Sequence, residues 1–460
     1  MDVSQTGTAL KVPRLQSSLW GSAEMETTDG TLGTALEPVL VSASGSVGGR
    51  WAARLAALVP PVTRRAFFHS RLLVLASGAA AVLVFGVSSS AVSVFDPAHI
   101  SVNFGAVGNL FAAPAIRWDS IWYLRIAGHG YSVAQDAGFS PLLPILIRGV
   151  SWATGSLVLA GVVISMVACV AGLEIVRRLT ELELGPTAAN RTVLLLAFGP
   201  MSLFLSAVYT DGLFLALSAG TIYAARRGRW RQAALLGGLG AIARPAGLLL
   251  AVPVVLLFFY GPREDAKPRE VDSWWQPRYG FAPVIGWSAA IPLMAAAFSA
   301  YLALRGFGAT GNAEAQLSDM HHSVTMPWVG AWRGLLAGGH ELWLVVRGQH
   351  AASDTSEALL QAIGLLIVIP AIVGTFRRLP AIYGIYVSLA VAVHLCTPTA
   401  GDPLKGFDRY ASLRFPLFMW AAIWAGERNI SNTVLIASAV ALALFTSQFA
   451  TWHVVGSLTL

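Results

Sequence analysis

The sequence predicts an all-α membrane protein that crosses the bilayer many times. Its 460 residues are 55% hydrophobic and only 12% charged, whereas soluble globular proteins are about a quarter charged. Apolar runs of roughly 20 residues, the length that crosses the hydrocarbon core, recur from Leu72 to the C-terminus. Lys and Arg cluster at the ends of these runs, as the positive-inside rule requires. We therefore interpret the net charge of +7 as membrane topology rather than as a nucleic-acid surface.

The chain divides into an N-terminal tail, residues 1–65, and a membrane domain, residues 66–460. The tail mixes Ser, Gly, Thr and scattered charges without a sustained period, so we expect it to be disordered and cytoplasmic. The first apolar run, 72–95, starts too late for a cleavable signal peptide and follows a basic stretch. It predicts a membrane anchor that enters from the cytoplasm.

The apolar runs predict about eleven membrane spans. Pro245 interrupts one of them, and because proline disfavours helix at the preceding residue, we expect two short or broken helices that form an outward hairpin. A single tilted helix is the alternative there. In order, the runs cover residues 72–95, 157–176, 191–208, 211–225, 232–260, 281–304, 358–376, 380–396, 415–426 and 433–450.

Three loops are expected on the extracytoplasmic side. We expect the protein to lie in the plasma membrane with its N-terminus in the cytoplasm. The basic clusters then fall on the cytoplasmic side, and the C-terminus falls outside. The outer loops are then the first loop, 96–156, the middle loop, 305–357, and the late loop, 397–414. Within the middle loop, residues 326–350 are amphipathic and predict an interfacial helix.

The outer loops hold most of the reactive side chains. A carboxylate or imidazole can accept a proton from a hydroxyl group, and a cationic cluster can bind a phosphate. Both kinds of group are present on the same predicted side of the membrane. They are Arg117, Asp119, Arg125 and His129 in the first loop, Asp319, His321 and His322 in the middle loop, and Asp402, Lys405, Asp408, Arg409 and Arg414 in the late loop.

Two aspartates have a structural and a functional interpretation. Asp119 precedes Ser-Ile-Trp-Tyr-Leu, where an aspartate can cap a helix by accepting hydrogen bonds from its first turn. On chemistry alone, we favour this cap over a catalytic base. Asp211 stands at the outer end of a span and has the same two interpretations. Trp118 and Tyr123 are more typical of an interfacial aromatic belt than of a sugar-stacking platform.

Three arginines are candidates for an anion site. Arg244 lies within the bundle, where a charge is costly unless it pairs or lines a cavity. It is therefore a functional candidate. Arg409 and Arg414 either reach the membrane interface from a span end or bind a phosphate, and the sequence does not separate these alternatives.

No cofactor is indicated. Cys169 and Cys396 lie in apolar runs without metal-ligand spacing, so they predict neither a disulfide nor a zinc site. His321 and His322 are adjacent, and their side chains diverge on a regular backbone. A divalent metal held by them with Asp319 is a weaker alternative than a polar loop that contacts substrate.

Four segments in the same order resemble bacterial members of a known family. Residues 117–124 read Arg-Trp-Asp-Ser-Ile-Trp-Tyr-Leu, and Phe-Gly-Pro at 198–200 leads to Tyr-Thr-Asp-Gly-Leu-Phe at 209–214. Ala-Arg-Pro-Ala-Gly follows at 243–247, and Arg-Tyr with Phe-Pro-Leu-Phe lies within 409–418. This pattern resembles the glycosylphosphatidylinositol mannosyltransferase II (PIG-V) family of the glycosyltransferase-C superfamily. Asp211 stands where that family has Glu, which keeps the carboxylate.

The resemblance implies a glycosyltransferase-C-type bundle and an inverting transferase. Such an enzyme takes mannose from a polyprenyl-phosphate mannose donor, which is its co-substrate, and passes it to a lipid-linked or glycan acceptor outside the membrane. Asp119 matches the catalytic base, which reverses our preference for the cap. Arg409, with Arg414 or Lys405, would bind the donor phosphate. The other expected substrate contacts are Arg117, Trp118, Tyr123, Arg125, His129, Asp211, Arg244, His321, His322 and Tyr410.

Two other functions fit parts of the sequence. A lipid or solute transporter would also be a helical bundle, but it would carry ionisable residues deep within several spans and a repeat symmetry, of which the sequence has little. A transferase of the same superfamily that uses another lipid-phosphate sugar is the second alternative. Nucleic acid is not an expected partner.

Overall fold

The fold is helical, as the sequence predicts. The computed structural model describes residues 59–264, 286–319, 322–349 and 357–451, and most of residues 1–65, the predicted tail, lie outside this set. In the described residues the regular elements are helices, with one isolated bridge between His322 and Thr399. Among the described residues, five helices are long and apolar enough to cross a membrane, so the predicted count of eleven spans stays a prediction. These five are α2 (Pro61–Phe85), α7 (Leu157–Leu184), the helix that ends with α13 (Gly286–Leu304), α16 (Glu357–Arg378) and α20 (Ser431–Thr451).

The first helix begins earlier than the apolar run that predicts it. α2 starts at Pro61, where proline suits the first turn of a helix. It ends at Gly86, whose φ of +72° favours glycine and breaks the helix inside the predicted span. The remainder of that span is a separate short helix, α3 (Ser89–Phe95).

The first loop folds into short helices. After α3 it contains α4 (Gly105–Ala112), α5 (Asp119–His129), the 3-10 turn η1 (Ala134–Gly138) and α6 (Leu142–Thr154).

The middle of the chain contains the predicted break. The helices after α7 are α8 (Pro186–Ala197), η2 (Ser202–Leu205), α9 (Thr210–Arg226) and α10 (Trp230–Ala243), followed by η3 (Pro245–Leu250) and α11 (Ala251–Tyr260). Helix α10 ends at Ala243, and Arg244 is extended, with φ −154° and ψ 145°. Because Pro245 disfavours helix at the preceding residue, the predicted interruption of 232–260 is confirmed.

The last third of the chain follows the predicted ranges closely. A helix, α15 (Pro327–Val346), is present where an interfacial helix was expected at 326–350, and its interfacial position stays a prediction. The other elements are α13 (Ala290–Leu304), α14 (Gly311–Glu314), η4 (Ala315–Asp319), α17 (Ala381–Leu395), α18 (Phe407–Ser412) and α19 (Phe415–Glu427).

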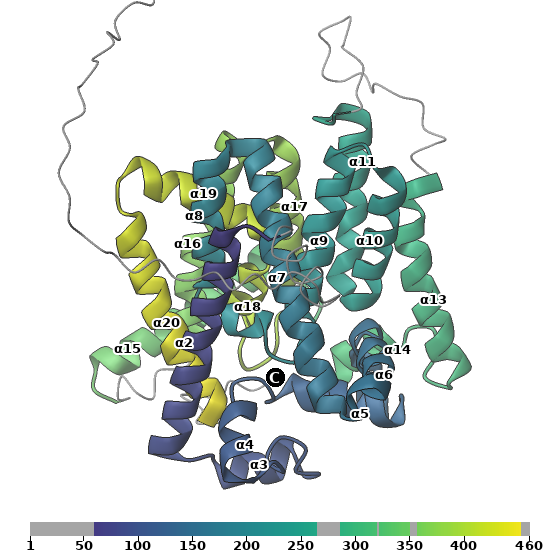
Figure 1. Cartoon of the computed structure of the whole chain (residues 1–460), viewed down its shortest axis with the longest axis vertical. Coiled ribbons are helices and arrows are strands. Elements are labelled where there is room, and N and C mark those ends of the chain that lie inside the picture. The colour runs from purple at the N-terminus through teal and green to yellow at the C-terminus, as the bar shows by residue number, and fades with distance from the viewer. Residues whose placement is uncertain (1–58, 265–285, 320–321, 350–356, 452–460) are drawn as a thin grey trace, which may run out of the picture. The chain divides into compact units, whose positions relative to one another are not determined.

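Within the compact unit Ala56–Leu460, helices far apart in the sequence pack together. α9 packs between α7 and α10, and α2 lies along α20, as Figure 1 shows. A large apolar core joins residues of α7, α9, α17 and α19. This core holds α9 at the centre of the unit.

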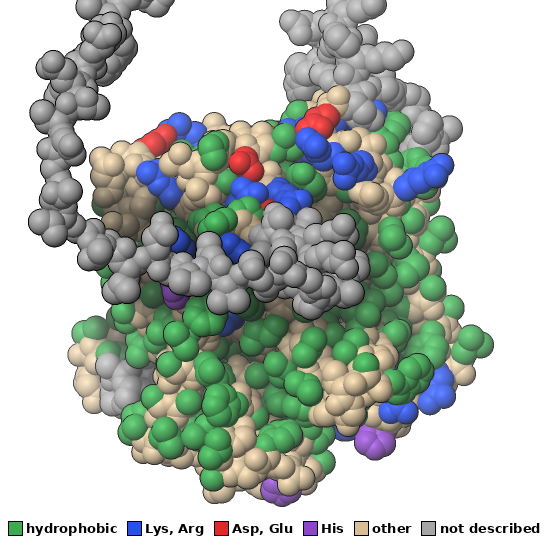
Figure 2. Space-filling model, in the orientation of Figure 1, with side chains coloured by type: hydrophobic (Ala, Val, Ile, Leu, Met, Phe, Trp, Pro, Cys, Tyr) green, Lys and Arg blue, Asp and Glu red, His purple; other side chains and the backbone are tan. Residues whose placement is uncertain are grey.

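Ion pairs tie several helix ends together at one end of the unit. Glu183 at the end of α7 accepts hydrogen bonds from Arg226 of α9 and from the Tyr383 hydroxyl group of α17, the latter at 2.7 Å. Arg378 of α16 pairs with Glu427 of α19 at 2.9 Å. Figure 2 shows Lys and Arg side chains gathered at the upper end of the view, above a largely hydrophobic surface. The basic clusters at these helix ends therefore lie on one side.

Gly247 fixes the turn that carries Arg244. A Cβ atom on Gly247 would lie 2.1 Å from the backbone oxygen of Gly240, and the Gly247 amide donates to the Arg244 carbonyl oxygen at 2.8 Å. We expect Gly247→Ala to cost about 1–3 kcal/mol, because backbone atoms must move to relieve the contact. Gly149→Ala in α6 is the matched control, since its Cβ meets nothing within 4 Å. Thermal unfolding of both variants measures the difference; equal midpoints would contradict the steric argument.

Candidate active site

Two buried carboxylates begin helices at the end of the unit opposite the basic clusters. Asp119 is the first residue of α5, and Asp211 is the second residue of α9. Amide N–H groups in the first turn of a helix stabilise negative charge. Neither N-cap residue, Trp118 or Tyr209, forms a side-chain cap. Asp119 is therefore not the helix cap considered above, since the N-cap position belongs to Trp118. Its carboxylate instead accepts a hydrogen bond from Arg409.

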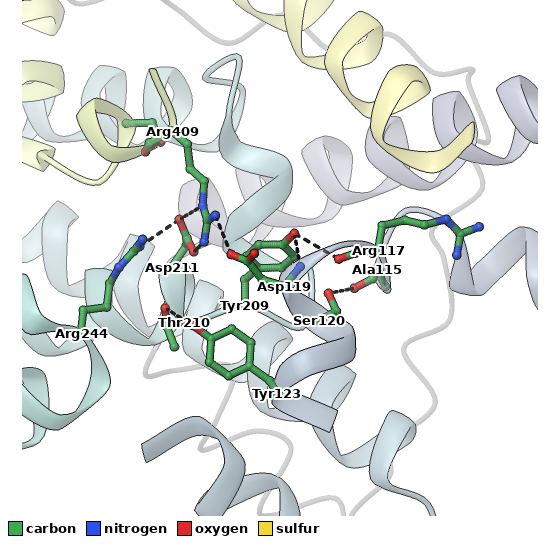
Figure 3. Close-up of polar contacts among 11 residues, drawn as sticks. Ala115, Arg117, Asp119, Ser120, Tyr123, Tyr209, Thr210, Asp211, Arg244 and Arg409 are labelled. Carbon is green, nitrogen blue, oxygen red and sulfur yellow. Dashed lines mark hydrogen bonds and ion pairs between the residues drawn. The ribbon is translucent and has the colours of Figure 1, made fainter. Parts of the chain in front are cut away.

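Arg409 of α18 joins the two carboxylates. Its Nη1 donates to Oδ2 of Asp119 at 2.8 Å. Its Nε and Nη2 donate to the two oxygens of Asp211 at 3.1 and 2.9 Å. The second contact is bidentate, a geometry that is stronger than a single bond. The guanidinium also lies over the rings of Tyr209 and Phe204, at 4.5 and 4.8 Å from their centroids. Figure 3 shows this cluster.

Arg244 completes the cluster from the break after α10. Its Nη1 lies 3.1 Å from Oδ1 of Asp211, and its guanidinium lies 4.7 Å from the centre of the Tyr410 ring. The extended backbone before Pro245 turns this residue out of the helix. Two arginines and two aspartates from four elements therefore balance their charges, which lowers the cost of burying them.

Tyr209 positions the start of α5. Its hydroxyl group donates to the Arg117 carbonyl oxygen at 3.0 Å and accepts from the Asp119 amide at 3.1 Å. Trp118, between these two residues, has a φ of +53°, a conformation that costs energy for a bulky residue. The surrounding contacts hold the backbone in this form and direct Asp119 toward Arg409. This role of Tyr209 was not predictable from the sequence, because its partners lie far away in the chain.

A cavity of about 310 Å³ opens beside Asp119 and Arg409, within the size range of small-molecule sites. Its wall combines aromatic rings with charged groups. The aromatic and charged residues that line it are Trp118, Asp119, Trp122, Tyr123, Phe139, Phe204, Tyr209, Arg244, His322, Glu357, Lys405, Asp408, Arg409, Tyr410, Phe445 and Phe449.

The structure brings most of the predicted site residues together. Asp211 lies behind the cavity wall, where it holds Arg244 and Arg409. The predicted residues that line the cavity are Trp118, Asp119, Tyr123, Arg244, His322, Lys405, Arg409 and Tyr410.

Four residues that were predicted to contact substrate do not line the cavity, and most of them bind other groups of the protein. Arg117 is fully buried and donates to backbone carbonyl oxygens, including that of Ala450 at 3.1 Å, while burial lowers its pKa to about 10. Arg125 stacks on Trp122 and pairs with Asp136. The other two residues are His129, which is exposed, and Arg414, which is buried and donates to the Tyr386 hydroxyl group at 3.3 Å.

The considered metal site falls largely outside the described residues. His321 and the Asp319 side chain are not described. His322 is described, and its Nδ1 lies 2.7 Å from the Thr397 carbonyl oxygen. Among the side chains that the structure does describe, there is no group of three or more His, Cys, Asp or Glu that could hold a metal ion.

Two acids that line the cavity were not predicted as site residues: Glu357 was not a candidate, and Asp408 had no assigned role. Glu357 is the first residue of α16, at the end of the middle loop, and nothing in the local sequence relates it to Asp119. Asp408 precedes Arg409, and its Oδ1 accepts a hydrogen bond from the Arg409 amide at 2.7 Å. Burial raises the pKa of Asp408 to about 6. Adjacency to Arg409 was the available signal for Asp408.

Comparison with known families gives a match over the part of the chain that carries Asp119, Asp211 and Arg244. Residues 88–259 match the family model for Mannosyltransferase (PIG-V). This agrees with the family that the sequence motifs resemble. Arg409 lies outside the matched range. The affiliation with bacterial members stays a prediction.

Three fungal relatives are similar to parts of this chain. GPI mannosyltransferase 2 of Yarrowia lipolytica is 25% identical over 146 residues, which are 32% of this chain and 41% of the relative. The protein of the same name from Cryptococcus neoformans is 28% identical, over 34% of this chain and 40% of the relative. That from Schizosaccharomyces pombe is 28% identical, over 30% of each. The chain thus spans less than half the length of these curated relatives.

Proposed function

We propose that this chain is an inverting mannosyltransferase that uses polyprenyl-phosphate mannose. The observation that carries the proposal is the Asp119–Arg409–Asp211 cluster at the wall of a cavity. It sets a carboxylate that can accept a proton beside a cation that can bind a phosphate. The match to a mannosyltransferase family over residues 88–259 supports mannose as the sugar.

Transfer with inversion needs one base and one stabilised leaving group. In the proposed reaction, Asp119 takes the proton of an acceptor hydroxyl group as its oxygen forms a bond to C1 of mannose. The bond between C1 and the phosphate oxygen breaks on the opposite face, and its electron pair leaves with the polyprenyl phosphate. Arg409 and Lys405, which line the cavity with Arg244, would stabilise the negative charge on that phosphate. The reaction needs no covalent sugar intermediate and no redox cofactor.

The position of the cavity supports an extracytoplasmic active site. Helix α9 has Asp211 near its start and Arg226 as its last residue. Arg226 pairs with Glu183 among the ion-paired helix ends described above. If the basic clusters lie in the cytoplasm, the cavity opens toward the outer face of the plasma membrane. Its aromatic wall, which includes Phe445 and Phe449, suits the lipid part of a donor. The proposed acceptor is a lipid-linked sugar or another glycan on that side.

The test is a transfer assay with purified protein in lipid nanodiscs. Polyprenyl-phosphate [14C]mannose is supplied with the host's extracted membrane lipids and glycans as acceptors, beside matched glucose and arabinose lipid phosphates. We expect labelled product from the mannose donor alone. Product from the glucose or arabinose donor instead would show a transferase of the same superfamily that uses another lipid-phosphate sugar. Donor binding without product, together with movement of the lipid between leaflets, would favour a flippase and contradict the proposal.

A further inference from the structure

Helix α15 carries an exposed apolar stripe that the proposed chemistry does not use. Trp328, Trp332 and Leu336 are 67%, 63% and 54% exposed. With Trp343 and Val346, which are also exposed, they form one stripe along the helix, because residues three, four or seven apart lie on the same side. A contiguous exposed apolar surface marks an interaction site. The stripe is therefore a candidate contact surface.

The opposite side of α15 is buried through glycines. Gly330, Gly334 and Gly338 are its buried residues. A Cβ atom on Gly330 would lie 1.9 Å from the Leu395 carbonyl oxygen, and one on Gly338 would lie 2.4 Å from the Cβ atom of Ala362. Helix α15 therefore packs directly on the end of α17 and the first turns of α16. This packing turns the apolar stripe away from the protein.

The charged residues of α15 favour a phospholipid surface as the partner of the stripe. Arg333 and Arg347 are exposed, and the Arg347 guanidinium lies 4.0 Å from the centre of the Trp343 ring. At 3.6 residues per turn, both arginines lie beside the stripe, whereas Glu341, the one acidic residue of α15, lies on the glycine side and is half-buried. Tryptophan rings suit the acyl boundary of a bilayer, and arginines beside them reach the lipid phosphates.

Helix α15 fits the membrane surface better than a position across the membrane. It has 20 residues, but it is not among the five described helices that are apolar enough to span a bilayer. In Figure 1 it runs across the direction of α2 and α20, below the basic helix ends at the top of the view. It packs on α16, one of the five candidate spans. Its outward side therefore meets the lipid around that helix.

The glycine side of α15 also contacts the late loop. A Cβ atom on Gly334 would lie 2.2 Å from Cγ of Leu404, which is buried. The next residue, Lys405, lines the cavity, as does Arg409. Because there is no space between Gly334 and Leu404, α15 and this part of the loop must move together.

A second connection lies just before α15. The Ser323 amide donates to the Pro398 carbonyl oxygen at 2.9 Å, and the Thr325 amide donates to that of Cys396 at 2.8 Å. Both ends of the loop segment 396–404 are thus attached to α15 or to the residues that lead into it. The position of α15 therefore affects the segment that precedes the cations of the cavity.

We propose that α15 binds the outer phospholipid leaflet and thereby holds the late loop in place. The apolar stripe lies at the acyl boundary, and Arg333 and Arg347 bind headgroup phosphates. The lipid contact is independent of the proposed function, whereas its effect on catalysis rests on that function. In the proposed reaction Lys405 and Arg409 bind the donor phosphate, and α15 sets them at the depth where the phosphate of a membrane lipid lies.

Tryptophan fluorescence tests the lipid contact without requiring transfer. The full-length wild type and a Trp328→Phe, Trp332→Phe, Trp343→Phe triple variant are placed in phosphatidylglycerol nanodiscs, and their difference spectrum isolates these three tryptophans. We expect lipid brominated on the upper acyl chain to quench this difference emission and aqueous iodide to leave most of it. Quenching by iodide alone would place the stripe in water. Quenching by neither reagent would show that protein covers the stripe, and both of these results overturn the proposal.

Hydrogen exchange tests the coupling to the late loop. Gly334→Ala adds a methyl group against Leu404, whereas the matched control Gly339→Ala adds one on the same helix where nothing lies within 4 Å. We expect amides within 396–410 to exchange about tenfold faster or more in Gly334→Ala, because overpacking strains the contact. They should exchange at the wild-type rate in Gly339→Ala. Equal exchange in the two variants would contradict the coupling.

A second variant changes the lipid contact without touching the packed side of α15. In Trp328→Ser combined with Trp332→Ser, we expect the same late-loop amides to exchange about tenfold faster or more in nanodiscs, the effect of losing buried aromatic surface. Exchange at the wild-type rate would show that the lipid contact does not hold the loop. Thermal unfolding confirms that the exchanged variants are folded.

The transfer assay separates this inference from the proposed function. If the chain transfers mannose, Gly334→Ala should lower kcat/KM for the donor by about 10²-fold, the cost of misplacing a binding group by about 1 Å, and Gly339→Ala should not. No transfer by the wild type, with quenching by the brominated lipid and coupled exchange, would contradict the mannosyltransferase and keep the lipid-binding helix. Wild-type transfer without lipid quenching would keep the enzyme and contradict the inference.

Discussion

Replacing Asp119 by Asn is expected to reduce the turnover of mannose transfer by about 10²- to 10⁴-fold, the usual contribution of a general base. The amide keeps the size of the side chain, and its oxygen can still accept from Nη1 of Arg409, which Asp119 does at 2.8 Å. It cannot accept the proton of a hydroxyl group. Donor affinity should change little, because Arg409 keeps its bidentate partner Asp211. Steady-state kinetics should therefore show a loss in kcat rather than a rise in KM for the donor.

The control for Asp119→Asn is Glu181→Gln. Glu181 is a carboxylate paired with Arg177 on α7, 44% exposed and outside the cavity, so its amide should leave transfer unchanged. If purified Asp119→Asn protein transfers mannose at the wild-type rate, Asp119 is not the base. The structure would then assign the carboxylate a positioning role toward Arg409.

Replacing Arg409 by Gln is expected to have the largest effect on stability, together with loss of transfer. Arg409 is the cation between Asp119 and Asp211. Its removal leaves Asp119 without this partner and Asp211 with Arg244. Breaking a buried ion pair by removing one partner costs about 3–5 kcal/mol. The midpoint of thermal unfolding should fall clearly, and product should drop to background.

Three further variants separate charge from geometry at this position. Arg409→Lys keeps the positive charge but not the planar fork, so it should recover part of the stability and little of the transfer. Adding Asp211→Asn to Arg409→Gln should cost less than the two single changes combined, since the pair is coupled. Arg378→Gln removes a surface ion pair and should cost under about 1 kcal/mol. A wild-type unfolding midpoint for Arg409→Gln would show that the cluster adds no stability.

Much of the helical pattern followed from local sequence. The break at Arg244 was predictable because Pro245 restricts the residue before it wherever it occurs. Helix α15 was predictable from amphipathic spacing. The end of α2 at Gly86 was not, since an apolar run does not reveal where a left-handed glycine interrupts it.

The candidate site was predictable in its parts but not in its arrangement. Arg244 stood out because a charge within an apolar run is costly. Asp119 and Asp211 stood out because they begin predicted helices and match carboxylates of the family motif. Their places in the predicted outer loops also selected Arg117 and Arg414, which the structure places away from the cavity wall. A buried arginine that bonds to backbone carbonyl oxygens and one that faces a cavity have the same local pattern. Only their neighbours distinguish them.

By itself, the sequence determined the class of protein, the helical spacing and the charged residues that must find partners in an apolar bundle. These properties depend on composition and short-range pattern. Only the tertiary structure decided which partners they find. Arg409 reaches Asp119 across 290 residues of chain and Asp211 across 198, and Glu357 reaches the same cavity from another helix. Such contacts depend on how the helices pack, and no local spacing encodes that.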